Sequence, residues 1–62
     1  MECRKFVIST GSTMREFHTL ERANTARREN PLAYGRIIAE YAGKPGLFGK
    51  MKWRHVADHI GK

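Results

Sequence analysis

KMKWRHVADHIGK, residues 50–62, is the stretch that decides the predicted fold. If residues 50–60 form a helix, one stripe of that helix is apolar, with residues spaced i, i+3, i+4 and i+7. The residues on this stripe are Trp53, Val56, Ala57 and Ile60. The pattern therefore predicts a helix over residues 50–60 that packs on the rest of the protein through this stripe.

Two histidines, His55 and His59, lie on the other side of this predicted helix. A helical zinc site of the hydrolase type has a glutamate directly after the first histidine, and Val56 stands at that place. A structural zinc site needs four protein ligands. Cys3 and His18 are the remaining candidates, and their spacing from the two histidines matches no familiar zinc site. We therefore expect no metal site and no cofactor.

The preceding stretch, ENPLAYGRIIAEYAGKPG, predicts a further helix over residues 31–42. Asn30 can cap this helix, and Pro31 suits its first position. Gly43 can end it, and a loop over residues 43–49 follows. Four residues repeat at i, i+3, i+4 and i+7 and are expected to face the core: Tyr34, Ile37, Ile38 and Tyr41.

Near the N-terminus, KFVIST is rich in residues that favour β-structure and predicts a strand over about residues 4–10. Thr13 and Glu16 have the spacing of a capping box, which predicts a helix over about residues 14–28. The predicted fold class is α+β and mainly α, with a short N-terminal strand followed by two to three helices. Residues 1–62 are expected to form a single small domain.

This order of a strand followed by two helices is similar to that of ribbon–helix–helix proteins, in which strands of two chains pair and enter the major groove. The resemblance covers residues 4–42 and leaves residues 44–62 unexplained. In the alternative, a compact monomer, the strand pairs near residues 47–53, because an isolated strand leaves its backbone groups without hydrogen bonds.

The length of the chain favours self-association. A chain of 62 residues is marginally stable alone, and a single cysteine allows no internal disulfide. We therefore predict a homodimer. The start of the chain does not resemble a signal peptide, and no apolar run approaches the roughly 20 residues of a membrane span. We expect a cytoplasmic protein with no membrane partner.

The net charge of +6 is concentrated toward the C-terminus. Residues 44–62 contain five lysines and arginines against Asp58, whereas residues 1–43 contain seven against five glutamates. A basic surface of this kind favours a polyanion, nucleic acid above all. On the predicted helices, the basic residues form two parallel ridges, which are suited to contact a phosphate backbone on both sides. The predicted nucleic-acid-binding residues are Arg15, Arg22, Lys50, Lys52, Arg54, His55 and His59.

The sequence thus predicts a small basic nucleic-acid-binding protein, regulatory rather than enzymatic. Catalysis is disfavoured because so short a chain can hardly enclose a substrate pocket. In the alternative, the chain is a protein-interaction module, an inhibitor or adaptor that binds an acidic protein through Leu47 and Phe48 of the predicted loop. The sequence does not distinguish DNA from RNA, or either of them from a protein partner.

Overall fold

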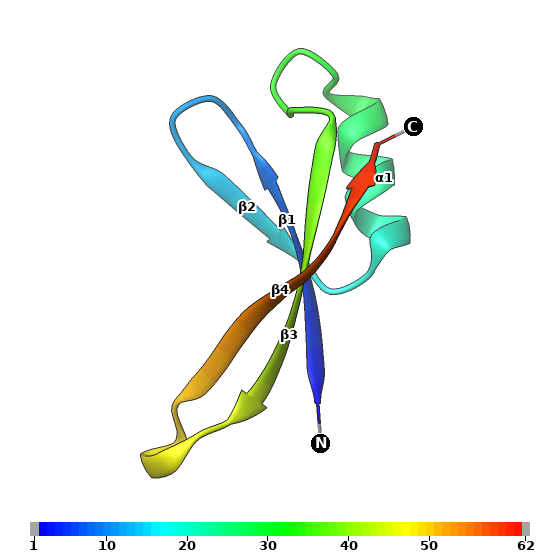
Figure 1. Cartoon of the computed structure of the whole chain (residues 1–62). Helices are drawn as coiled ribbons and strands as arrows, with labels where there is room; N and C mark the ends of the chain where they lie inside the picture. Colours follow the sequence, from blue (N-terminus) through cyan, green and yellow to red (C-terminus); the bar gives the residue numbers. More distant parts are fainter. Residues whose placement is uncertain (1, 62) are drawn as a thin grey trace.

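The computed structural model describes residues 2–61 and shows an antiparallel sheet of four strands with one α-helix against it (Figure 1). The strands lie in the order β2-β1-β3-β4, and each neighbouring pair is antiparallel. Two hairpins are therefore joined side by side through β1 and β3. The elements in chain order are β1 (Cys3–Ser9), β2 (Met14–Phe17), α1 (Leu20–Glu29), β3 (Ile37–Pro45), the 3-10 turn η1 (Leu47–Gly49) and β4 (Met51–Ile60).

The predicted fold class is wrong, because the described chain is mainly sheet and contains a single α-helix. The strand predicted over residues 4–10 corresponds to β1, and α1 occupies the second part of the helix predicted over residues 14–28. The helices predicted over residues 31–42 and 50–60 are wrong, since β3 occupies the second half of the first range and β4 occupies nearly all of the second. The predicted loop over residues 43–49 begins with the end of β3.

The first hairpin explains why the helix begins later than predicted. The Thr10 N–H donates to the Thr13 carbonyl at 2.7 Å, and the Thr10 hydroxyl also reaches that carbonyl at 3.0 Å. Thr13 therefore closes the turn between β1 and β2 instead of capping a helix. The cap is Thr19, whose side chain accepts a hydrogen bond from the Arg22 N–H at 3.1 Å.

The strand β1 pairs with β3 from Cys3 to Ile8 and with β2 from Phe6 to Ser9. Within residues 2–61, β1 is followed by a second strand and not by two helices, so the ribbon–helix–helix order is not present. The strand β1 also does not pair near residues 47–53, where the alternative prediction placed its partner. The turn η1 lies instead at the end of the β3–β4 hairpin. Among residues 2–61, no helix has the length and hydropathy needed to cross a membrane.

The core lies between α1 and one face of the sheet. Ile8 and Ile38 face each other across β1 and β3, and both are fully buried. Because Ala23 of α1 has a small side chain, the helix can approach them closely. Phe17, Leu20 and Tyr34 pack around the edge of this cluster. The buried apolar residues are Phe6, Ile8, Ala23, Ile38 and Ala42.

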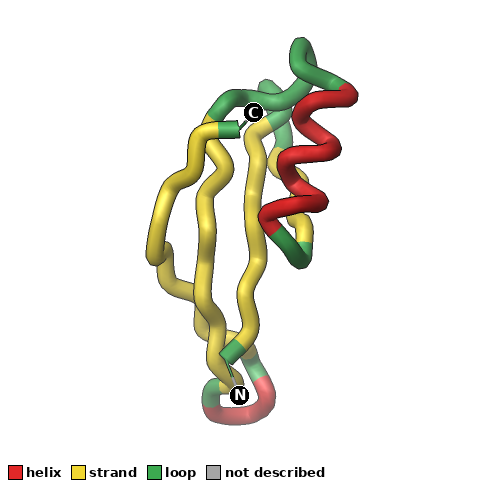
Figure 2. The backbone as a smooth tube through the Cα atoms, turned by 90° about the vertical axis from the view of Figure 1, so that its right-hand side faces the viewer, coloured by secondary structure: helices red, strands yellow, loops and turns green. Residues whose placement is uncertain are grey.

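The molecule is elongated, with dimensions of 39 × 22 × 15 Å. The end of the β3–β4 hairpin projects away from α1, with η1 at its tip (Figure 1). Seen from the side, α1 covers one face of the sheet and leaves the other without a covering element (Figure 2). We call residues 44–54 the arm, and the sheet face opposite α1 the open face.

Candidate nucleic-acid interface

The strand β4 carries most of the predicted nucleic-acid-binding residues and contains a β-bulge. Glu40 of β3 pairs with Ala57, and the next residue, Tyr41, pairs with His55. Val56 is therefore an extra residue in β4, which shifts the alternation of side chains by one position. Residues four apart in a regular strand lie on the same face. Because the bulge falls between His55 and His59, these two histidines lie on opposite faces.

Each histidine has a carboxylate partner on its own face. The His55 Nε2 lies 2.7 Å from Asp58 Oδ1, and the His55 ring packs edge-on against Tyr41. The His59 Nε2 lies 2.7 Å from Glu40 Oε1, on the side of the sheet that faces α1. Within residues 2–61, no three histidine, cysteine or acidic residues are grouped to hold a metal ion. Lys52, His55 and His59 therefore do not share one edge, as the predicted helix over residues 50–60 would have placed them.

The arm presents cations on the face opposite Trp53. Lys44 of β3 and Lys52 of β4 are directly paired in the register, so their side chains leave the same face of the hairpin. Arg54 lies on this face too, opposite Ala42, and Lys50 is exposed beside the turn. Like charges directly opposite each other destabilise a sheet. The Lys44–Lys52 pair is therefore a feature that the fold alone does not explain.

One glutamate partly neutralises the arm. The Glu2 carboxylate lies 3.4 Å from the Arg54 guanidinium and 3.9 Å from the Lys44 ammonium. It also lies 3.2 Å from Arg4 of β1. Among residues 2–61, neither Lys50 nor Lys52 has an ion pair. A positive excess thus remains at the outer half of the arm, where the hairpin is only two strands wide.

The other predicted cations lie elsewhere. Arg15 is in β2, at the sheet edge opposite β4, and Arg22 is in α1. The strands β1 and β3 separate Arg15 from β4, and the arm projects away from α1, which carries Arg22 (Figure 1). The predicted pair of parallel helical ridges does not exist, because the segment containing Lys52 is a strand. Sequence reasoning also omitted Lys44, which could have been found from its place in the basic last third of the chain.

The tip of the arm carries two exposed apolar side chains. Leu47 is 83% exposed and Phe48 is 97% exposed. Phe48 has a φ of 63°, in the left-handed region that bulky residues rarely adopt. The next residue, Gly49, also has a positive φ, of 77°. Neither Leu47 nor Phe48 contributes to the core, so both are available for contact with a partner.

No protein-family model, curated protein or solved structure matches this chain.

The Glu40 carboxylate links β3 to its neighbours. The hydrogen bond from His59 is the main cause that holds the pKa of Glu40 below its usual value of 4.5. The Arg4 guanidinium, 2.5 Å away, also lowers this pKa, whereas desolvation opposes the shift. At pH values between the folded and the unfolded pKa of Glu40, the unfolded chain binds more protons than the folded one. The free energy of unfolding therefore rises with pH in this interval.

We therefore expect the stability that Glu40 contributes to be complete above about pH 4.5 and to be lost as the pH falls through the lower, folded pKa. Glu40→Gln should reduce the loss of stability below pH 4.5. Urea unfolding at a series of pH values between 3 and 6 measures this, with Glu29→Gln at the exposed end of α1 as the control. Equal pH dependence in the wild-type protein and Glu40→Gln would contradict the prediction.

Proposed function

We propose that this protein binds nucleic acid by placing the arm against the phosphate backbone, with duplex DNA as the favoured form. The observation that carries this proposal is the cross-strand pair of Lys44 and Lys52. Two ammonium groups on one face of a narrow hairpin repel each other. A phosphate between or beside them turns this repulsion into two favourable contacts and releases condensed counterions.

The shape of the arm supports duplex DNA over duplex RNA. A two-stranded β-ribbon fits the major groove of B-form DNA, which is about 12 Å wide. The major groove of A-form RNA is too deep and narrow for side chains to read. The arm is such a ribbon at the Pro45–Met51 and Lys44–Lys52 pairs, where only β3 and β4 are present.

The proposal includes a regulatory, non-enzymatic role and a cytoplasmic location. Cys3 is exposed as a free thiol. It is also the one cysteine of the chain, which suits a reducing compartment. The contacts proposed here are made to the backbone of the duplex, and such contacts position a protein without selecting a sequence.

The test compares two double variants that change the net charge equally. Lys44→Ala with Lys52→Ala removes the central arm cations, and Arg15→Ala with Arg22→Ala removes two cations far from the arm. A charged hydrogen bond contributes about 1.5 kcal/mol or more, so the arm variant should lose about 100-fold in affinity for a DNA duplex at low salt. The slope of log affinity against log salt should flatten by about 1.8, at 0.9 per phosphate.

The Arg15/Arg22 variant should keep most of its affinity and an unchanged salt slope. Fluorescence anisotropy with a labelled duplex between 50 and 200 mM salt gives both quantities. Thermal unfolding of the arm variant should show equal or greater stability than the wild type, because the like-charge pair is gone. Equal losses in the two double variants would mean that net charge alone governs binding, and would reject the arm as the site.

A second candidate function rests on the tip. Leu47 and Phe48 are exposed beside the arm cations, a combination that also suits an acidic protein with an apolar pocket. In this case the protein acts as an inhibitor or adaptor. Pull-down from lysate with and without nuclease separates the two functions. Arm-dependent capture of a protein that survives nuclease, together with no affinity for duplex, would favour this second function.

A further inference from the structure

The open face is apolar to an unusual degree for a surface. Its apolar residues alternate with those that face α1, as the strand register requires, and they are Val7, Met14, Ile37, Tyr41, Trp53 and Ile60. Met14 is 71% exposed, Ile60 68% and Ile37 55%. By contrast, only two large side chains of the described residues are fully buried on the α1 side, Ile8 and Ile38. Exposed apolar side chains gathered on one face of a sheet are typical of an interaction site.

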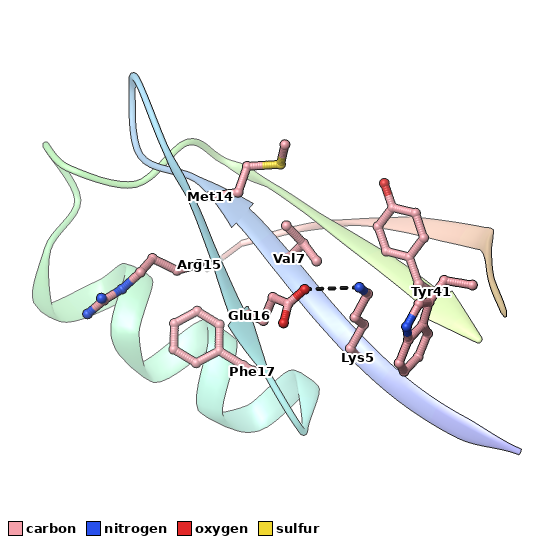
Figure 3. Close-up of a pocket in the computed structure, with 8 residues that line it drawn as sticks. Lys5, Val7, Met14, Arg15, Glu16, Phe17 and Tyr41 are labelled. Carbon is pink, nitrogen blue, oxygen red and sulfur yellow. Dashed lines mark hydrogen bonds and ion pairs between the residues drawn. The ribbon is translucent and has the colours of Figure 1, made fainter. Parts of the chain in front are cut away.

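The charges of the open face are paired among themselves. The Lys5 ammonium lies 2.9 Å from Glu16 and 4.4 Å from the centre of the Trp53 ring. Figure 3 shows the Lys5 ammonium pointing toward the Glu16 carboxylate, with the Tyr41 ring on the other side of Lys5. These residues line a pocket of about 640 Å³. Asp58 in turn pairs with His55. The face has no excess of cations for a polyanion and therefore fits an apolar, nearly neutral partner.

The accessible area of the chain is larger than that of a compact protein of the same mass. The chain exposes 4860 Å², whereas a compact monomer of 7.1 kDa is expected to expose about 4,100 Å². The elongated shape and the projecting arm contribute to this excess of about 800 Å², as does the open face. The small core and the uncovered apolar face together point to an interface that the isolated chain leaves open, and a standard interface takes about 800 Å² from each partner.

We propose that two copies of this chain pack with their open faces together. Two sheets packed in this way form a sandwich about 10 Å thick, and the same patch serves both copies around a two-fold axis. Lys44, Lys52 and Arg54 lie on the opposite face of the hairpin and stay accessible in this dimer. The inference does not depend on nucleic-acid binding, because it rests on the apolar face and its area.

The test introduces a charge into the proposed interface. Ile37 lies directly opposite Ile60 and is exposed, so Ile37→Glu leaves the core in place. The matched control is Leu32→Glu, which makes the same charge change at a fully exposed loop position. Sedimentation equilibrium without nucleic acid, and with a reductant to protect Cys3, measures the mass. An unpaired charge buried twice in a symmetric dimer should raise the dissociation constant at least about 100-fold.

The expected result is a particle of about 14 kDa, twice the chain mass, for the wild type and Leu32→Glu, and of 7.1 kDa for Ile37→Glu. Trp53 is the one tryptophan of the chain, and its emission should shift to shorter wavelength as the dimer forms. Wild-type protein that stays at 7.1 kDa up to about 100 µM, above ordinary dimer dissociation constants, would overturn the proposal. Masses above a dimer, or an unchanged mass for Ile37→Glu, would equally overturn it.

Discussion

Ile38→Ala should lower the free energy of unfolding by about 2–5 kcal/mol, the usual cost of such a truncation in a core. Ile38 is fully buried, faces Ile8 across the two central strands, and belongs to the same cluster as Ala23 of α1. At roughly 0.05–0.15 kcal/mol per residue, a chain of this length has a total stability of about 3–9 kcal/mol. The expected loss is therefore a large part of the total stability.

Urea unfolding followed by circular dichroism measures this loss. The control is Leu32→Ala, which removes a comparable side chain from a fully exposed position and should change stability by less than about 0.5 kcal/mol. Similar small losses in both variants would show that the core does not lie between α1 and the central strands. Because the core holds so few large side chains, this experiment tests the fold more directly than any surface substitution.

Gly43→Val should lower stability by about 1–3 kcal/mol, as overpacking does in a well-packed site. The Trp53 indole lies flat against Gly43, and a Cβ added there would stand 2.5 Å from Cε3 of that ring. The ring must therefore move, which also disturbs its contact with the Lys5 ammonium. Valine otherwise favours strands, so the expected loss comes from this one collision.

A double-variant comparison isolates the collision. In a Trp53→Ala background the ring is absent, and Gly43→Val should then be neutral or stabilising. Chemical unfolding of the four proteins gives the interaction energy between the two positions. An equal loss from Gly43→Val in both backgrounds would mean that another contact, not Trp53, requires the glycine.

Sequence reasoning succeeded where local chemistry decides structure. The β-branched run of KFVIST forms β1, and the residues between 20 and 28 form most of α1, as expected. The concentration of positive charge in the last third of the chain is likewise a property of the sequence. Three of the predicted nucleic-acid-binding residues, Lys50, Lys52 and Arg54, lie on the arm, and their binding to nucleic acid is still a proposal.

The segment around β3 was mistaken for a helix because β3 is a central strand. Its two faces are both apolar, with Ile38 and Ala42 toward α1 and Ile37 and Tyr41 on the open face. A strand with two apolar faces has no simple alternation, and its side chains match a helical template by chance. The neighbours that decide between the two structures, β1 and β4, are distant in the sequence.

The strand β4 shows most clearly which properties the sequence determines and which depend on the tertiary structure. Composition and spacing by themselves determined the charge of this segment and the identity of its apolar residues. The bulge at Val56, however, exists only because β4 pairs with β3. That extra residue shifts the alternation, so Trp53 and Ile60, seven residues apart, share the open face and imitate a helical stripe. It also places His55 and His59 on opposite faces. The backbone groups of a strand form hydrogen bonds with neighbouring strands, whereas those of a helix form them within the helix. Only the tertiary structure decides which of the two this segment forms.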